Sequence, residues 1–263
     1  MDTLIRTAAV ESPQRIALGT GRLILSEPAD GPTNMAIDAA LLRRAGDQTG
    51  PTLRFYSWAN ATLSLGYFQS VAERDGHPDS LAAPVVRRAS GGGALIHDRE
   101  LTYSLIVPAE SVPADSRRLY RLVHNAIREA CRDFGIRLER FADLELDPVP
   151  DTRFLCFQRR TDEDLLLHGY KVLGSAQRKE RGGLLQHGGL LLTASPYAPQ
   201  LPGLADLADR VPSMEAIRQS LIEKLGVTLG STWNVGELSD SEKSEAALEL
   251  QTKFGCKAWT EKR

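Results

Sequence analysis

The chain is poor in cysteine and histidine, and these shortages exclude several kinds of site. Its 263 residues include three cysteines and five histidines. The cysteines are odd in number and widely spaced, so they form neither a disulfide framework nor a CxxC metal pair. The histidines show no spacing that is typical of metal ligands, and we therefore expect no metal site.

Excess positive charge and long apolar runs are also missing. The net charge is −2 and the sequence pI is about 6.2, which argues against a nucleic-acid-binding protein. No apolar segment approaches the roughly 20 residues that span a bilayer, so we expect no membrane association. Asp2, Arg6 and Glu11 interrupt any apolar core of a signal peptide. We therefore expect a cytoplasmic protein.

The apolar residues that are present follow both helical and strand periodicity. Strand patterns dominate the middle of the chain, and helical patterns lie between strands or near the end. This order predicts an α+β fold with a mixed β-sheet core and flanking helices. Helices are predicted over 31–46, 116–134, 213–226 and 239–255, with Thr33 or Asn34 capping the first.

Alternating apolar residues predict the strands. Residues 51–58 and 61–68 are expected to pair with each other. The turn "HGYK" predicts a hairpin that places residues 165–167 opposite 172–174. Further strands are predicted over 22–28, 136–141, 152–157 and 182–194.

A glycine run lies within a strand pattern in "RRASGGGALIHD", residues 87–98. Consecutive glycines weaken a strand but allow a ligand to approach the backbone closely. The run lacks the spacing of a P-loop. Arg87, Arg88, His97 and Asp98 lie near it and would suit an anionic or carbonyl-bearing ligand. A bulge or tight bend is the structural alternative.

Cys156 and Lys171 raise a second question. Free cysteine is among the most buried residue types, so Cys156 could simply fill a core. A nucleophilic thiol needs a lowered pKa, which a nearby cation such as Lys171 could provide. Lys171 lies between Gly169 and Gly174, and sequence spacing alone does not establish contact with Cys156. From the residues alone, Cys156 can be either a core residue or a nucleophile.

Two long motifs, "RRASGGGALIHDRELTYSLIVP" and "GYKVLGSAQRKERGGLLQHGGLLL", resemble the lipoate–protein ligase, octanoyltransferase and biotin–protein ligase superfamily. "GPTNMAIDAALL" and "LRFYSWANATLSLGYFQ" resemble its N-terminal part, so the match covers about residues 22–195. The resemblance implies a fold akin to class II aminoacyl-tRNA synthetases and biotin synthetases. It also implies a lead-in over 1–21 and one catalytic domain over 22–263, with a helical end at about 213–263.

Within this superfamily the chain is most similar to the cysteine-dependent bacterial octanoyltransferases. "HDRELTYS" stands where ligases usually have "HDxGN", and Cys156 and Phe157 match a "CF" pair. The resemblance implies that Cys156 forms an acyl thioester and that Lys171 helps to ionise it. It further implies a set of acyl- or substrate-binding residues: Arg87, Ser90, Gly91, Gly92, Gly93, His97, Gly174, Ser175, Ala176, Gln177 and His187.

The implied activity is transfer of an octanoyl group from octanoyl-acyl carrier protein to a lysine of a lipoyl carrier domain. The acceptor would be a glycine cleavage H protein or an E2 subunit, and no cofactor would be needed. Arg159, Arg160, Arg178, Lys179 and Arg181 could form a basic docking rim or could be solvated strand ends.

Three alternatives remain open from the sequence. The first is a short ATP-dependent lipoate ligase, which would need ATP and Mg and is favoured by Gly93. The second is an amidotransferase that acts between carrier domains. The third is a non-catalytic homologue.

Overall fold

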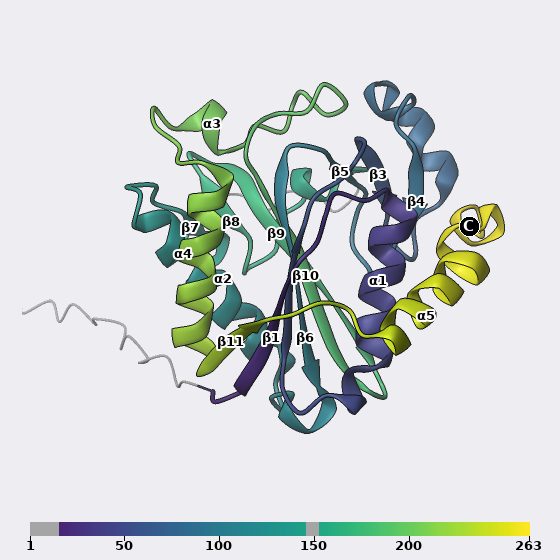
Figure 1. Ribbon diagram of the computed structural model, residues 1–263. Coiled ribbons are helices and arrows are strands. Elements are labelled where there is room, and N and C mark those ends of the chain that lie inside the picture. The colour runs from purple at the N-terminus through teal and green to yellow at the C-terminus, as the bar shows by residue number, and fades with distance from the viewer. Residues whose placement is uncertain (1–15, 146–152) are drawn as a thin grey trace, which may run out of the picture.

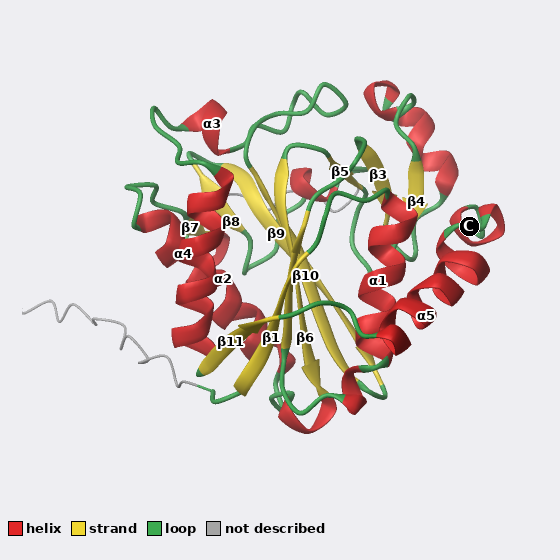
Figure 2. Cartoon of the chain, in the orientation of Figure 1, coloured by secondary structure: helices red, strands yellow, loops and turns green. Residues whose placement is uncertain are grey.

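A single mixed β-sheet forms the centre of the molecule (Figure 2). The computed structural model describes residues 16–145 and 153–263. The strand order is β11-β1-β2-β6-β10-β9-β8-β7. The strands are β1 (Gly19–Leu25), β2 (Thr52–Tyr56), β6 (Glu100–Pro108), β7 (Glu139–Arg140), β8 (Leu165–Leu167), β9 (Tyr170–Glu180), β10 (Gly183–Leu191) and β11 (Ser231–Val235). β11, β1 and β2 are parallel and the remaining pairs are antiparallel, which confirms the predicted mixed sheet.

Helices cover both faces of the sheet (Figure 1). α1 and α5 lie together on one side, and α2 and α4 lie together on the other. The helices are α1 (Gly31–Arg43), α2 (Ser116–Arg132), α3 (Leu204–Leu207), α4 (Met214–Leu229), α5 (Asp240–Glu249) and α6 (Lys257–Thr260). A π-helical turn over residues 250–254 extends α5, so all four predicted helices are confirmed. No helix in the described residues is long and apolar enough to cross a membrane.

The cap predicted for α1 is wrong by a few residues. Asp30 is the N-cap, and its side chain accepts a hydrogen bond of 2.9 Å from the Thr33 backbone N–H. The helix therefore starts at Gly31, before Thr33 and Asn34. Asn34 is instead fully buried and donates to the backbone carbonyls of Ala29 and Ser57.

The burial of the central strand β6 explains why helices cover both faces of the sheet. Its nine residues are all buried. Tyr103 and Leu105 join the core beneath α2 and α4, whereas Ile106 joins the core beneath α1. Successive side chains of a strand point to opposite faces, so the alternation of this one segment requires helices on both sides.

The predicted pairing of residues 51–58 with 61–68 is wrong. β2 lies in the large sheet between β1 and β6, whereas β3 (Thr62–Leu65) belongs to a second sheet of order β4-β3-β5. β4 (Val85–Arg87) and β5 (Leu95–His97) complete this small sheet. The apolar pattern identified both strands, but it carries no information about partners when strands are buried on both faces.

The predicted hairpin is confirmed, with a different register. His168 (φ 50°) and Gly169 (φ 81°) form a two-residue turn in the left-handed region. Leu166 faces Lys171 and Leu165 faces Leu173, with an irregularity between Leu165 and Leu166. The short turn therefore places residues 165–167 opposite 170–173 rather than 172–174.

A buried ion pair ties α1 to the sheet. Arg54 on β2 is fully buried and lies 2.8 Å from Asp38 on α1. Its guanidinium also donates to the side chains of Asn34 (2.7 Å) and Ser26 (2.9 Å). Burial alone would raise the pKa of Asp38, but a hydrogen bond from His187 and the charge of Arg54 hold it below its usual value.

Arg54→Met should lower the free energy of unfolding by about 3–5 kcal/mol, because it leaves the Asp38 carboxylate buried without its partner. The control is Arg132→Met, which removes an exposed pair with Glu129 and should cost at most about 1 kcal/mol. Urea denaturation at pH 7 measures both. Equal losses in the two variants would contradict the assigned role of Arg54.

Candidate active site

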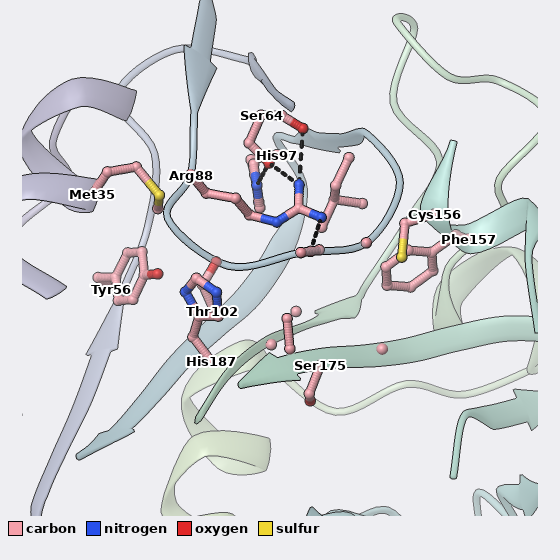
Figure 3. Close-up of a pocket in the computed structure, with 17 residues that line it drawn as sticks. Met35, Tyr56, Ser64, Arg88, His97, Thr102, Cys156, Phe157, Ser175 and His187 are labelled. Atoms are coloured by element: carbon pink, nitrogen blue, oxygen red, sulfur yellow. Dashed lines mark hydrogen bonds between the residues drawn. The ribbon is translucent and has the colours of Figure 1, made fainter. Parts of the chain in front are cut away.

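A cavity opens between the glycine loop (residues 88–94), β9 and β10. It holds about 510 Å³ of space between protein atoms, counting its open mouth. We call it the central cavity. Figure 3 shows Cys156 and Phe157 at one end of it and Met35 and Tyr56 at the other. Its lining residues are Met35, Tyr56, Ser64, Arg88, Gly91, Gly92, Leu95, His97, Thr102, Cys156, Phe157, Gly174, Ser175, Ala176, His187, Gly188 and Gly189.

Cys156 does not lie in a strand, so the strand predicted over 152–157 is wrong where the structure describes it. Cys156 opens a 3₁₀ turn over residues 156–158. Its N–H donates to the Ala94 carbonyl (2.7 Å), and the Ala94 N–H donates to the Phe154 carbonyl (3.0 Å). A side chain on Gly93 would lie 3.0 Å from the Cys156 nitrogen. The bare backbone of Gly93 therefore allows the cysteine segment to pack on the glycine loop.

Lys171 reaches Cys156 from β9. Its Nζ lies 4.0 Å from the Cys156 sulfur and 3.4 Å from the Cys156 carbonyl oxygen. A Cβ on Gly174 would lie 2.7 Å from the Lys171 Cε, so the lysine packs directly over the glycine backbone. The structure thus brings the two candidate catalytic residues together, which sequence spacing could not establish.

Asp164 forms an ion pair with Lys171 that the sequence alone did not predict. The Asp164 Oδ2 lies 2.7 Å from the Lys171 Nζ, and both side chains are almost completely buried. The Asp164 carboxylate also accepts the Thr161 N–H at 2.7 Å. The charge of Lys171 is therefore largely compensated before any thiolate forms. In the sequence, Asp164 directly precedes residues 165–167 of the predicted hairpin, and this position hinted at its contact with Lys171.

Arg88 is a second cation at the site, and it lacks a carboxylate partner within the described residues. Its guanidinium donates to the carbonyls of Gly91 (2.8 Å) and Gly93 (2.7 Å) and to Ser64. A Cβ on Gly92 would lie 3.0 Å from the Arg88 Nη2 and 3.8 Å from the Cys156 sulfur. Arg88 and Cys156 therefore face each other across Gly92.

Arg87, which was expected to contact substrate, points away from the cavity. Its guanidinium donates to the carbonyls of Thr260, Gly66 and Gln69. Arg87 is the last residue of β4, and the side chain of Arg88, the next residue, points to the opposite side: Arg88 reaches the cavity while Arg87 holds the C-terminal helix α6. Arg87, a predicted binding residue, is therefore not among the residues that line the central cavity.

Two histidines are held in polar networks at the cavity wall. His187 lies 3.4 Å from Asp38 through Nδ1 and 2.6 Å from the Ser90 hydroxyl through Nε2. Ser90 is not among the residues that line the central cavity. Its hydroxyl is hydrogen bonded to His187, which does line it.

His97 contacts Glu100 (2.7 Å) and Ser64 (2.8 Å), and it stacks on the Trp58 ring. Because the second nitrogen of each histidine faces a serine hydroxyl, both rings have fixed orientations.

The β9 segment contributes the opposite wall. Ser175 and Ala176, two of the predicted substrate-binding residues, line the cavity. Gln177 does not line the cavity, because its amide donates to the Ser116 carbonyl and to Gln186 on β10. Gln177 alternates with Ala176 along the strand and so faces α2 rather than the substrate space.

His124 on α2 fixes Ser175. Its Nδ1 lies 2.6 Å from the Glu163 carbonyl, and its Nε2 lies 2.7 Å from the Ser175 hydroxyl. Burial lowers the pKa of His124 to about 3, and the charge of Lys171 contributes in the same direction. The neutral ring therefore donates from Nδ1 and accepts from Ser175.

Several lining residues carried no signal of their own in the sequence. Met35 and Tyr56 belong to ordinary apolar helix and strand patterns, and Phe157 stood out only as part of the "CF" pair.

Cys131 differs from Cys156, because it is fully buried and burial raises its pKa to about 12. The described residues contain no group of three or more histidine, cysteine or acidic side chains arranged to hold a metal ion.

A family model described as the Lipoyl protein ligase A/B catalytic domain matches residues 30–225. The chain belongs to this family. The match includes the glycine loop, Cys156 and Lys171, and it confirms the resemblance seen in the sequence motifs.

Relatives of similar length are named Octanoyltransferase LipM. The protein from Kyrpidia tusciae is 30% identical, over 91% of this chain and 98% of its own length. The protein from Bacillus subtilis is also 30% identical, over 93% of this chain and 99% of its own length.

Solved structures of lipoate–protein ligases share the fold. A lipoate–protein ligase A bound with ATP has a TM-score of 0.74 and 24% identity, over 92% of this chain and 98% of its own. A bipartite ligase from Thermoplasma acidophilum has a TM-score of 0.73 and 23% identity, over 92% of this chain and 96% of its own. This likeness confirms the predicted fold class.

The neutral state of His124 predicts a loss of stability in acid. Because its pKa is lower in the folded chain than in the unfolded chain, stability is complete above about pH 6.5 and falls towards pH 3. The slope from this group is about 1.4 kcal/mol per pH unit. His124→Asn keeps a donor for the Glu163 carbonyl but removes the titration.

Urea denaturation at pH 6 and pH 4 measures this effect. The parent should lose about 2–3 kcal/mol more than His124→Asn between these values, although the variant is less stable at pH 7. An identical pH dependence in the two proteins would show that His124 does not titrate as described.

Proposed function

We propose that this protein is an octanoyltransferase that carries the octanoyl group on Cys156. The donor would be octanoyl-acyl carrier protein, and the acceptor would be a lysine of a lipoyl carrier domain. The observation that carries the proposal is the Cys156 sulfur at the end of a largely apolar cavity, 4.0 Å from the buried Lys171 ammonium. The octanoyltransferase names of relatives that match nearly the whole chain support it.

In the first step, the Cys156 thiolate attacks the thioester carbonyl of the donor. A bond forms between the Cys156 sulfur and the acyl carbon, and the bond to the carrier sulfur breaks. The carrier leaves as a thiolate and takes up the proton that Cys156 lost on ionising. The alkyl chain would lie along the central cavity towards Met35 and Tyr56. Burial contributes about 0.8 kcal/mol for each CH₂ removed from water.

Two cations would stabilise the thiolate, and they differ in strength. The charge of Lys171 is shared with Asp164, whereas Arg88 is hydrogen bonded to neutral acceptors. A positive charge without a carboxylate acts more strongly on a nearby sulfur in a poorly solvated site. We therefore assign Arg88 a share in holding the thiolate, next to the role of Lys171.

In the second step, the ε-amine of the acceptor lysine attacks the acyl-enzyme. The new carbon–nitrogen bond replaces the carbon–sulfur bond, and the proton released by the amine returns to the Cys156 sulfur. A thioester is thereby converted to a more stable amide, so the overall transfer needs no ATP. We accordingly propose that the protein uses no cofactor.

The ligase alternative loses its main sequence argument. Gly93 suggested a ligase, but here a Cβ at this position would be in tight contact, 3.0 Å from the Cys156 nitrogen and the Phe154 carbonyl oxygen. Packing of the cysteine segment is thus a sufficient reason for Gly93. An amidotransferase would share the Cys156 chemistry and differ only in its donor.

The first test is intact mass measurement after incubation with octanoyl-acyl carrier protein in the absence of ATP. The parent should gain the mass of one octanoyl group, and Cys156→Ser should gain none. Octanoylated carrier domain offered as donor distinguishes the amidotransferase. A parent that stays unmodified and acylates a carrier domain only with free acid and ATP would be a ligase.

The Lys171–Asp164 pair generates a further prediction. Lys171→Met should cost about 3–5 kcal/mol of stability, because the Asp164 carboxylate stays buried without its partner. The double variant Lys171→Met/Asp164→Asn should recover most of this stability, since it removes both charges. Acyl-enzyme formation should stay slow in both variants.

Urea denaturation and the rate of octanoyl adduct formation give the two readouts. Normal adduct formation in the stable double variant would mean that Lys171 serves only to compensate Asp164.

A further inference from the structure

A second cavity adjoins the central cavity at Phe157 and is lined by Lys171. It is lined by Arg153, Phe157, Gln158, Arg160, Tyr170, Lys171, Gln200, Leu201 and Pro202, and it holds about 620 Å³ of space, counting its mouth. We call it the outer groove. Phe157 lines both cavities, and Lys171, whose ammonium is next to the Cys156 sulfur, lines only the outer groove. The two cavities therefore adjoin at Phe157, and the outer groove reaches the Lys171 ammonium that lies 4.0 Å from the Cys156 sulfur.

The groove offers three kinds of contact. Phe157, Leu201 and Pro202 provide apolar walls, and Tyr170 at the hairpin is half exposed. Gln158 and Gln200 bring amide groups that can donate and accept hydrogen bonds. Such a lining suits a flexible chain that alternates apolar segments with amides.

Arg153 and Arg160 add positive charge. In the described residues neither guanidinium forms an ion pair with a carboxylate, whereas Arg140 and Arg121 on the nearby surface pair with Glu163. Arg160 donates to the carbonyls of Phe157 (2.7 Å) and Gly169 (3.3 Å).

The electrostatics of Arg160 reflect its neighbours. Burial lowers its pKa; the charge of Asp164 opposes this and that of Arg153 adds to it. Two guanidinium groups that form no ion pair within residues 16–145 and 153–263 favour a phosphate, which arginine binds in a bidentate manner.

We infer that the outer groove binds the phosphopantetheine arm of the thioester donor. This inference rests on the proposed function. In the donor the carbonyl joins the alkyl chain on one side and the thiol arm on the other. With the alkyl chain in the central cavity and the carbonyl at Cys156, the arm leaves past Lys171 and Phe157. Its two amides then meet Gln158 and Gln200, and its phosphate meets Arg153 and Arg160.

A series of donors without carrier protein tests this inference. Octanoyl-N-acetylcysteamine has a short thiol, octanoyl-pantetheine adds the remaining arm, and octanoyl-phosphopantetheine adds the phosphate. The rate of adduct formation on Cys156 is measured for each by intact mass, without ATP. The parent should react about tenfold faster with the phosphorylated donor than with octanoyl-pantetheine, because a charge-assisted hydrogen bond between arginine and the phosphate contributes about this factor.

Arg153→Gln should lose most of this preference and keep its rate with octanoyl-N-acetylcysteamine. Arg153→Lys should restore part of the preference, because it retains the charge. The matched control is Arg181→Gln, an exposed arginine in the turn beyond the far end of β9, which should behave as the parent.

Two results would overturn the inference while leaving the proposed function intact. One is equal rates of the parent with all three donors. The other is an equal slowing of Arg153→Gln with every donor, which indicates a structural role. Absence of an adduct with every donor would overturn the inference and the proposed function together. Loss in Arg153→Gln of ATP-dependent acylation only would assign the groove to a nucleotide instead.

Discussion

The hydrogen-bonded contact between Ala94 and the Phe154–Cys156 segment is the constraint on which the site depends. These two pieces of chain come from different parts of the sequence, and two backbone hydrogen bonds hold them together. Their contact sets the Cys156 sulfur at the end of the central cavity. Gly93 favours this contact, because a Cβ at this position would lie only 3.0 Å from the Cys156 nitrogen and from the Phe154 carbonyl oxygen.

Buried charges then determine the chemistry that this position can support. The Lys171–Asp164 pair and the Arg54–Asp38 pair are both buried, and in each pair the two opposite charges compensate each other. Arg88 differs, since its hydrogen bonds go to neutral oxygen atoms and no carboxylate in the described part of the chain pairs with its charge. Such a charge is costly unless a negative group forms nearby. A thiolate or a developing oxyanion at Cys156 would be that group.

The two cavities on either side of Cys156 divide the proposed donor between them. The central cavity is mostly apolar and ends at Met35 and Tyr56, which suits an alkyl chain. The outer groove carries amides and arginines, which suits the polar arm. Phe157 separates the two, so the carbonyl carbon can lie beside the sulfur while both ends of the donor are bound.

The sequence by itself determined the helices, most strands, the family, and the identity of Cys156 and Lys171 as candidates, because periodicity and motifs are local in the chain. Only the tertiary structure decided that Arg88 and not Arg87 faces the cavity, since strand orientation depends on which sheet the strand joins. It also decided that Asp164 pairs with Lys171, because the register of the β8–β9 hairpin depends on the two-residue turn and the bulge. The turn motif predicts that a hairpin forms, but the irregularity between Leu165 and Leu166 shifts its register, and the partners of β2 and β3 lie far away in the sequence.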